Sequence, residues 1–287
     1  LMSSADPGLM IVDNSGEPVY LQPTAAGQFV TDFKRQVVNG MPYLTYYVGT
    51  PFGGWAYGAY YVMDQSYTIV DTWTIHDGRG ADEHDLLLLD NGHALLFTYV
   101  PVAADLSPYG GPAQGTIMDI YLEEQDAAKN VVFSWRASDH LPLTDTYMAL
   151  SESPLDYAHT NAVALDRDGN ILISSRNLSE ITKINRQTGE VMWRLGGRSN
   201  QFTFTNDIGF TFQHAIQRLA TGHLLLFDNG NRHTPPHSRA VEYEIDEATK
   251  TITRTWHYPG DQSVFSPFMA NAQRLDNGNT LIGWGAL

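Results

Sequence analysis

Residues 157–197 read YAHTNAVALDRDGNILISSRNLSEITKINRQTGEVMWRLGG. Apolar residues alternate with others in 163–165 and 171–173, on either side of the turn pair Asp168-Gly169. This period-two pattern around an Asp-Gly turn predicts a β-hairpin. A second hairpin follows over 181–193. The stretch is therefore predicted to form a four-stranded antiparallel meander of about forty residues, the size of one propeller blade.

Two sequence markers repeat along the rest of the chain. Turn pairs that resemble Asp168-Gly169 recur, each between two apolar strands, at Asn39-Gly40, Asn91-Gly92, Thr221-Gly222 and Asn277-Gly278. Tryptophans near the last strand of each unit also recur, at Trp73, Trp135, Trp193 and Trp256, which are 62, 58 and 63 residues apart. Two independent markers at nearly the same period indicate a repeat architecture.

The repeats predict an all-β fold in a single domain, residues 1–287. The four fuller units are 29–76, 84–137, 159–197 and 214–260. Residues 9–20 resemble the outer hairpin of a unit and 270–284 an inner hairpin, so the terminal blades are expected to be incomplete in this chain. A β-sandwich is the alternative, but it does not explain the regular spacing. The long connections 99–114, 138–156 and 198–212 are expected to lie over one face and shape a pocket.

Composition narrows the possible partners. The net charge of −15 disfavours nucleic acid, which requires clustered Lys and Arg. An anionic substrate would need local Arg and His, because the net charge of the chain is negative.

No apolar run is long enough to cross a bilayer, so no membrane contact is expected. There is no cysteine. The start LMSSADPG does not read as a signal peptide, and the sequence leaves open whether the termini are trimmed. The sequon Asn177-Leu178-Ser179 weakly favours a secreted or extracytoplasmic protein.

One position of the repeat carries the candidate chemistry. The residues eight positions before the turn glycines are Asp32, His84, Asn161, His214 and Ala270. In a propeller the first strand of each blade lines the central channel, so these side chains are expected to converge. His159 lies two residues before Asn161 and so on the same face of its strand, and Arg176 ends the next strand. This constellation predicts a pocket for an oxyanion.

Other interpretations of these histidines stay open at this point. A single histidine here is more often a polar residue that caps a strand end. Three histidines also suit zinc or iron, but no carboxylate pattern singles out a metal, and none is predicted. Phosphate-loop, dinucleotide-binding and nucleophile-elbow motifs are missing from the sequence, so we expect neither a cofactor nor nucleotide chemistry.

An ordered set of motifs resembles the PAPS-independent arylsulfotransferases, the ASST family. These motifs are His159-x-Asn161, Ser174-Ser175-Arg176, Trp193-Arg194-Leu195-Gly196-Gly197, Phe212-Gln213-His214 and Phe227-Asp228-Asn229-Gly230. The resemblance extends over about 9–285 and is greatest to the branch found in fungi and actinomycetes. The cysteines of the bacterial enzymes have no counterpart.

The resemblance implies a six-bladed β-propeller of four-stranded antiparallel blades. It implies that His214 is transiently sulfated and that His84, His159 and Arg176 support catalysis, with Asn161 binding substrate. The expected reaction moves a sulfuryl group from an aryl sulfate to a phenol through sulfohistidine, so the expected partners are small aromatic molecules. Two alternatives are a non-sulfur cyclase or isomerase of secondary metabolism and a non-catalytic secreted binding propeller.

Overall fold

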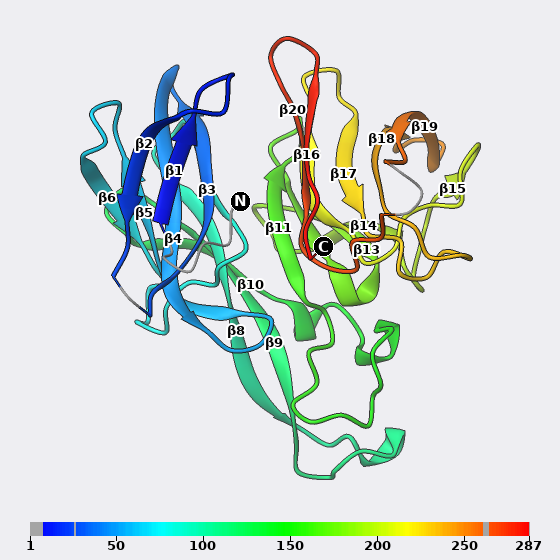
Figure 1. Cartoon of the computed structure of the whole chain (residues 1–287). Helices are drawn as coiled ribbons and strands as arrows, with labels where there is room; N and C mark the ends of the chain where they lie inside the picture. Colours follow the sequence, from blue (N-terminus) through cyan, green and yellow to red (C-terminus); the bar gives the residue numbers. More distant parts are fainter. Residues whose placement is uncertain (1–7, 26, 261–263, 287) are drawn as a thin grey trace. The chain divides into compact units, whose positions relative to one another are not determined.

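The computed structural model describes residues 8–25, 27–260 and 264–286. Every regular element among these residues is a β-strand or one turn of 3-10 helix. The strands form four larger sheets and two hairpins, and Figure 1 shows consecutive strands side by side within each sheet.

Contacts along the backbone divide the chain into two compact units. The first contains Leu1–Tyr99 and Tyr121–Ser134, and the second contains Val100–Ile120 and Trp135–Leu287. The division falls within strands β8, β9 and β10, which run from one unit into the other. The single domain expected from the sequence stays a prediction.

The first unit begins with a hairpin and a complete sheet. The hairpin pairs β1 with β2, and the sheet has the strand order β3-β4-β5-β6, with antiparallel neighbours. Its strands are β1 Gly8–Val12, β2 Pro18–Pro23, β3 Phe29–Val38, β4 Met41–Pro51, β5 Ala56–Met63 and β6 Ile69–Trp73. Leu9 of the hairpin packs on Tyr46 and Met63 of the sheet.

The next sheet, with the order β7-β8-β9-β10, spans the division between the units. Its strands are β7 Leu86–Leu88, β8 Ala94–Ala104, β9 Gly115–Gln125 and β10 Val131–Arg136. Leu86 and Leu96 of this sheet pack against Tyr47, Tyr60 and Trp73 of the preceding one, within the first unit. The connection predicted at 99–114 is shorter than expected, because β8 continues to Ala104 with side chains that alternate between more and less exposed.

The second unit holds two larger sheets and a hairpin. Their orders are β11-β12-β13-β14, β16-β17-β18-β19 with β15 parallel on the outer edge, and β20-β21. The strands are β11 Thr160–Leu165, β12 Ile171–Ser175, β13 Glu180–Ile184, β14 Val191–Gly196, β15 Thr203–Phe204, β16 His214–Arg218, β17 Leu224–Asp228, β18 Arg239–Asp246, β19 Thr251–Tyr258, β20 Asn271–Arg274 and β21 Thr280–Gly283.

Consecutive sheets of the second unit pack face to face through apolar side chains. Leu172 and Trp193 of the β11–β14 sheet lie in one buried cluster with Leu224 and Tyr243 of the next sheet. The hairpin β20–β21 packs in turn on the β16–β19 sheet, where Phe227 meets Trp284 edge to face. Burial of such apolar surface stabilises the stack by about 25 cal/mol per Å².

Both markers of the repeat fall where the sequence predicted. Trp73, Trp135, Trp193 and Trp256 all lie on the fourth strand of a sheet, namely β6, β10, β14 and β19. The five turn glycines have φ between 77° and 90°, which favours glycine because other residues are strained there. The prediction of an all-β fold built from four-stranded antiparallel sheets is confirmed, and the terminal repeats are two-stranded as expected. The number of blades stays a prediction.

Candidate functional site

The first strands of three sheets carry a β-bulge near the predicted position. The register shifts between Thr31 and Lys34, between Thr160 and Ala162, and between His214 and Gln217. Residues beside these shifts adopt positive φ, with 48° at Asp32, 51° at His159 and 56° at Ala215. A bulge re-aims side chains and is common beside functional sites. The recurring bulge therefore gives the predicted position a structural basis.

His214 is buried at the start of β16, and its ring orientation is set by an amide. Nδ1 lies 2.7 Å from Oδ1 of Asn229. The amide nitrogen of Asn229 donates to the backbone oxygens of Ser266 and Met269, at 2.8 and 3.0 Å. Because both carbonyls can only accept, the oxygen of the amide must face His214, and Nδ1 must be the donor. In the neutral ring Nε2 is then the nitrogen without hydrogen.

Nδ1 of His159 faces a charged partner, whereas Nδ1 of His214 faces an amide. Its Nδ1 lies 2.5 Å from Oδ2 of Asp156, and both side chains are mostly buried. The backbone oxygen of Asp156 accepts a hydrogen bond from the amide of Asn177. A carboxylate at this distance stabilises positive charge on an imidazole. Nδ1 of His159 thus faces the carboxylate, which fixes the orientation of the ring.

Arg176 and Asn161 connect the two histidines. The backbone N–H of Arg176 donates to the backbone oxygen of His159 at 2.8 Å, and its guanidinium stacks on Phe212 at 4.6 Å. The amide of Asn161 donates to the backbone oxygen of Gln213, which precedes His214, at 2.8 Å. His159, Asn161, Arg176 and His214 therefore belong to one contiguous cluster in the second unit.

His84 lies in the first unit, just before β7. Its Nδ1 lies 2.5 Å from Oδ1 of Asp82, which also accepts the backbone N–H of His84. The other oxygen of Asp82 accepts the N–H of Ala56, so the buried carboxylate is fixed. Burial raises the pKa of the neighbouring Glu83 to about 7, against the opposing charge of His84. The convergence of His84 with the histidines of the second unit stays a prediction.

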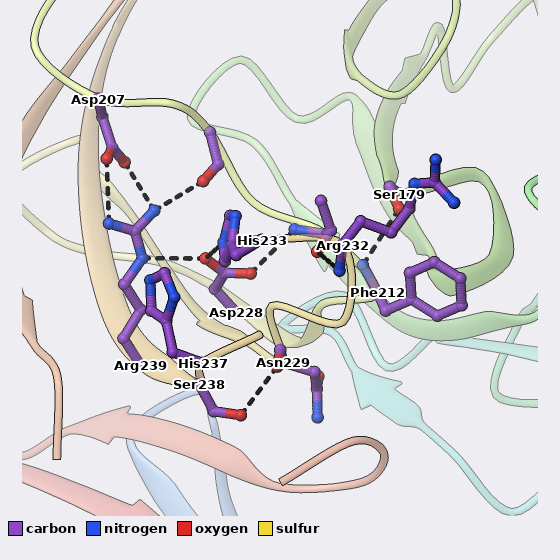
Figure 2. Close-up of polar contacts among 12 residues, drawn as sticks. Ser179, Asp207, Phe212, Asp228, Asn229, Arg232, His233, His237, Ser238 and Arg239 are labelled. Carbon is purple, nitrogen blue, oxygen red and sulfur yellow. Dashed lines mark hydrogen bonds and ion pairs between the residues drawn. The ribbon is translucent and has the colours of Figure 1, made fainter. Parts of the chain in front are cut away.

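A buried ion network supports the loop that carries Asn229. Oδ2 of Asp228 accepts hydrogen bonds from His233 and Arg239, at 2.7 and 2.9 Å, and Arg239 also binds both oxygens of Asp207 (Figure 2). Burial alone would raise the pKa of Asp207, but hydrogen bonds from Arg239 and Tyr243 outweigh it and lower the pKa. The network fixes both ends of the segment between Asp228 and Arg239.

Gly230 adds a second constraint on this loop. Its φ is +68°, and a Cβ atom there would lie 1.7 Å from the backbone oxygen of His237. Ser238 closes the same loop by donating to the backbone oxygen of Asn229 at 2.8 Å (Figure 2). Only glycine fits at position 230, which explains the Asp-Asn-Gly order of the motif.

Sequence reasoning missed the residues that orient the histidines. Asp156 lies in a connection three residues before His159, at a distance in sequence that no strand periodicity marks. Asn229 was part of a quoted motif, but without an assigned role. Asp82 lies two residues before His84, and the structure places its carboxylate in the interior. The sequence could have pointed to these orienting residues through the acidic or amide residue that lies near each predicted histidine or in a motif quoted with it.

The described residues contain neither a metal-binding cluster nor a membrane-spanning helix. No group of three or more His, Asp or Glu side chains in 8–25, 27–260 and 264–286 is arranged to hold a metal ion. Within the same ranges no helix has the length and apolar character to span a membrane.

The fold and site define a class, an all-β protein of repeated four-stranded sheets with histidine, arginine and asparagine clustered where first strands begin. Residues 34–287 match the sequence profile of the arylsulfotransferases (ASST). The chain belongs to this family.

Two similar proteins illustrate the relationship. The chain is 29% identical over 167 residues to the arylsulfate sulfotransferase AssT of Escherichia coli O6:H1 (strain CFT073), a match that covers 45% of this chain and 28% of that protein. A crystal structure of a protein of unknown function from Bacteroides caccae superposes with a TM-score of 0.51 at 12% identity, over 96% of this chain and 78% of the other. The second likeness concerns the fold alone.

Proposed function

We propose that this protein is an aryl sulfotransferase that moves a sulfuryl group from an aryl sulfate to a phenol through Nε2 of His214. Family membership supports the reaction class. The observation that carries the assignment of His214 is its hydrogen bond to Asn229, whose amide is itself held by two backbone carbonyls. This arrangement fixes the tautomer in which Nε2 has the lone pair, as a nitrogen nucleophile requires.

In the first step Nε2 of His214 attacks the sulfur of the donor. The N–S bond forms as the S–O bond breaks, and the departing phenolate takes the electron pair. His159, protonated beside Asp156, gives that oxygen a proton. The sulfated ring then carries a positive charge and the sulfuryl group a negative one. The amide oxygen of Asn229 faces the Nδ1–H and stabilises the ring.

In the second step the acceptor phenol loses its proton to the now neutral His159. Its oxygen attacks sulfur, the N–S bond breaks, and the electron pair returns to Nε2 of His214. Protons and charges therefore balance over the cycle. The two substrates are small aromatic molecules that use the site in turn.

Arg176 supplies the positive charge that the sulfuryl oxygens need. Its guanidinium is oriented by the amide oxygen of Asn177 and the backbone oxygen of Pro267, at 2.8 and 3.2 Å. We assign Asn161 to substrate binding beside it. The catalytic role expected for His84 stays a prediction. Local cationic groups of this kind answer the problem that a net charge of −15 poses for an anionic substrate.

The test is transfer from 4-nitrophenyl sulfate to phenol, followed by nitrophenolate absorbance, with mass spectrometry of the protein after the donor alone. We expect turnover and a protein heavier by one sulfuryl group at His214. His214→Ala should lose both, with a rate at least ~10³-fold lower, because the covalent route is removed.

The matched control is His257→Ala, at an exposed histidine of β19. It should keep the activity. Equal activity of His214→Ala and wild type would overturn the proposal, as would conversion of a phenolic substrate only in reactions without a sulfate donor, which is the outcome that a cyclase or isomerase would give.

A further inference from the structure

Two arginine side chains of the second unit lie against the ring of Tyr147. The guanidinium carbons of Arg198 and Arg232 are 4.7 and 4.3 Å from the centre of its ring. The tyrosine is half-buried, and both arginines are exposed. Two cations against one ring concentrate positive charge there, which suits an anionic ligand.

Loops of the second unit build this surface and fix its backbone. The N–H of Tyr147 donates to the backbone oxygen of Asn177 at 2.9 Å, and Nε of Arg198 donates to the backbone oxygen of Thr146 at 3.2 Å. The N–H of Arg232 donates to Oγ1 of Thr211 at 3.1 Å. The bond from Nε of Arg198 and the contacts of both guanidiniums with the ring of Tyr147 reduce the ordering that is needed when a ligand binds.

The surface adjoins the candidate active site. The rings of Tyr147 and Phe212 are 6.4 Å apart, and Phe212 carries the guanidinium of Arg176 on its face at 4.6 Å. Phe212 is two residues from His214. Figure 2 shows the side chain of Arg232 extending away from the Asp228 network, on the side where Phe212 lies. A substrate whose sulfur is at His214 can therefore reach Tyr147 across one ring.

The charges of this surface are unusual for the chain. Several arginines of the second unit are neutralised, such as Arg194 by Glu180 and Arg239 by Asp228. Arg198 and Arg232 form no ion pair with any described residue, although the chain has 32 acidic residues against 17 basic ones. Apart from Nε of Arg198, which donates to Thr146, the guanidinium donors are thus available to an anion from outside.

We propose that Tyr147, Arg198 and Arg232 form a recognition site for the remote end of the substrate, and that this end is an aromatic ring bearing a second anionic group. The proposal rests on the proposed function in placing the reacting end at His214. Guanidinium planes stack on an aromatic ring and donate paired hydrogen bonds to a carboxylate or sulfonate. The preferred substrates would then be phenols or aryl sulfates with a second acidic substituent.

Binding of two non-transferable probes tests the site. Naphthalene-2,6-disulfonate has an anionic group at each end and naphthalene-2-sulfonate at one, and neither carries a sulfate ester. We expect calorimetry at low salt to give about tenfold tighter binding of the disulfonate to wild type, a ratio typical of one charge-assisted contact. The ratio should shrink at 0.5 M NaCl, where charges are screened (Debye length ~4 Å).

Arg198→Gln combined with Arg232→Gln should bring the ratio close to one. Arg167→Gln removes one exposed arginine at the β11–β12 turn, at the other end of these strands from His159, and should keep the ratio. Melting temperatures establish that each variant is folded. Tyr147→Leu, which keeps an apolar side chain but no ring, should weaken binding of both probes.

The outcomes separate the two proposals. A ratio near one in wild type, or a ratio unchanged in the double variant, overturns the recognition site whether or not sulfate is transferred. A ratio of about ten that depends on the two arginines supports the site even if no transfer occurs. In that case the proposed reaction alone fails.

Discussion

His159 and His214 stand at the starts of the first strands of two neighbouring sheets, yet their Nδ1 atoms face different partners. His159 faces the carboxylate of Asp156 and His214 the amide of Asn229. A carboxylate offers a full negative charge to a protonated ring, whereas an amide oxygen offers only a dipole. In the proposed mechanism this difference gives identical side chains separate roles, a proton donor and a neutral nucleophile.

The anchoring of each partner strengthens this contrast. Asn229 has both its N–H groups committed to carbonyl oxygens, so it cannot turn. Asp156 has one oxygen at His159 and another that is buried without a hydrogen-bond partner in the described part of the chain. His84, which pairs with the buried Asp82, follows the pattern of His159. We therefore propose that the charge of the partner decides the role of each histidine.

Asn229→Asp replaces the amide beside His214 with a carboxylate, and it should remove the difference between His214 and His159 most completely. In Asn229→Asp the new charge stabilises protonated His214, so the nucleophile is lost at a higher pH than in wild type. We expect the acid limb of the pH–rate profile to move to higher pH and the neutral-pH rate to fall roughly 10²-fold. The measurement is kcat against pH with 4-nitrophenyl sulfate.

Asn229→Ala is the companion variant, because it removes the acceptor without adding charge. Its activity should fall at every pH, with the acid limb where wild type has it. Both variants lose hydrogen bonds to Ser266 and Met269, which costs about 1–3 kcal/mol, so unfolding is measured separately. A pH profile of Asn229→Asp that coincides with wild type would refute the role of the amide.

The reverse exchange at the other histidine should have a smaller effect. Asp156→Asn gives His159 the kind of partner that His214 has, so the cationic form loses its stabilisation. We expect kcat to fall about tenfold, because the proton donor loses its carboxylate partner. Donors with better leaving groups need less protonation, so the loss should shrink from phenyl sulfate to 4-nitrophenyl sulfate. Equal losses for both donors would contradict an acid role.

The smallest expected effect concerns stability beside His84. Folding raises the pKa of Glu83 from 4.5 to about 7, so the folded state binds more protons between these values. Wild type should therefore lose stability as pH rises through this window. Glu83→Gln removes the penalty and should gain on the order of 1 kcal/mol relative to wild type at pH 7 and above, after allowance for partial exposure.

Urea unfolding at pH 4.5, 6 and 8 measures that difference. Glu152→Gln, at an exposed glutamate, controls for the removal of one negative charge from an acidic protein. A gain for Glu83→Gln that is the same at all three pH values would argue against a buried, protonated carboxyl.

The sequence predicts the repeat well because turn glycines and packed tryptophans are local requirements. Gly169 needs a positive φ and Trp193 needs a buried place, and each leaves a mark at a regular position. The partners of the histidines leave no such mark. Asp156 and Asn229 act through loops whose course depends on contacts distant in sequence, such as that between Asn229 and Ser266. Whether His84 joins the same site depends on how the two units are placed, which the local pattern does not specify.

Asp228 and Asn229 are neighbours in sequence but have different roles. Asp228 holds the loop through its ion pair with Arg239, and Asn229 determines which nitrogen of His214 carries the proton. Any local opening of this loop would release the imidazole to either tautomer while the surrounding ladders stay intact. Catalytic competence is consequently a more fragile property than the architecture. Heat, urea or a mutation in the ion network would silence such an enzyme well before it melts.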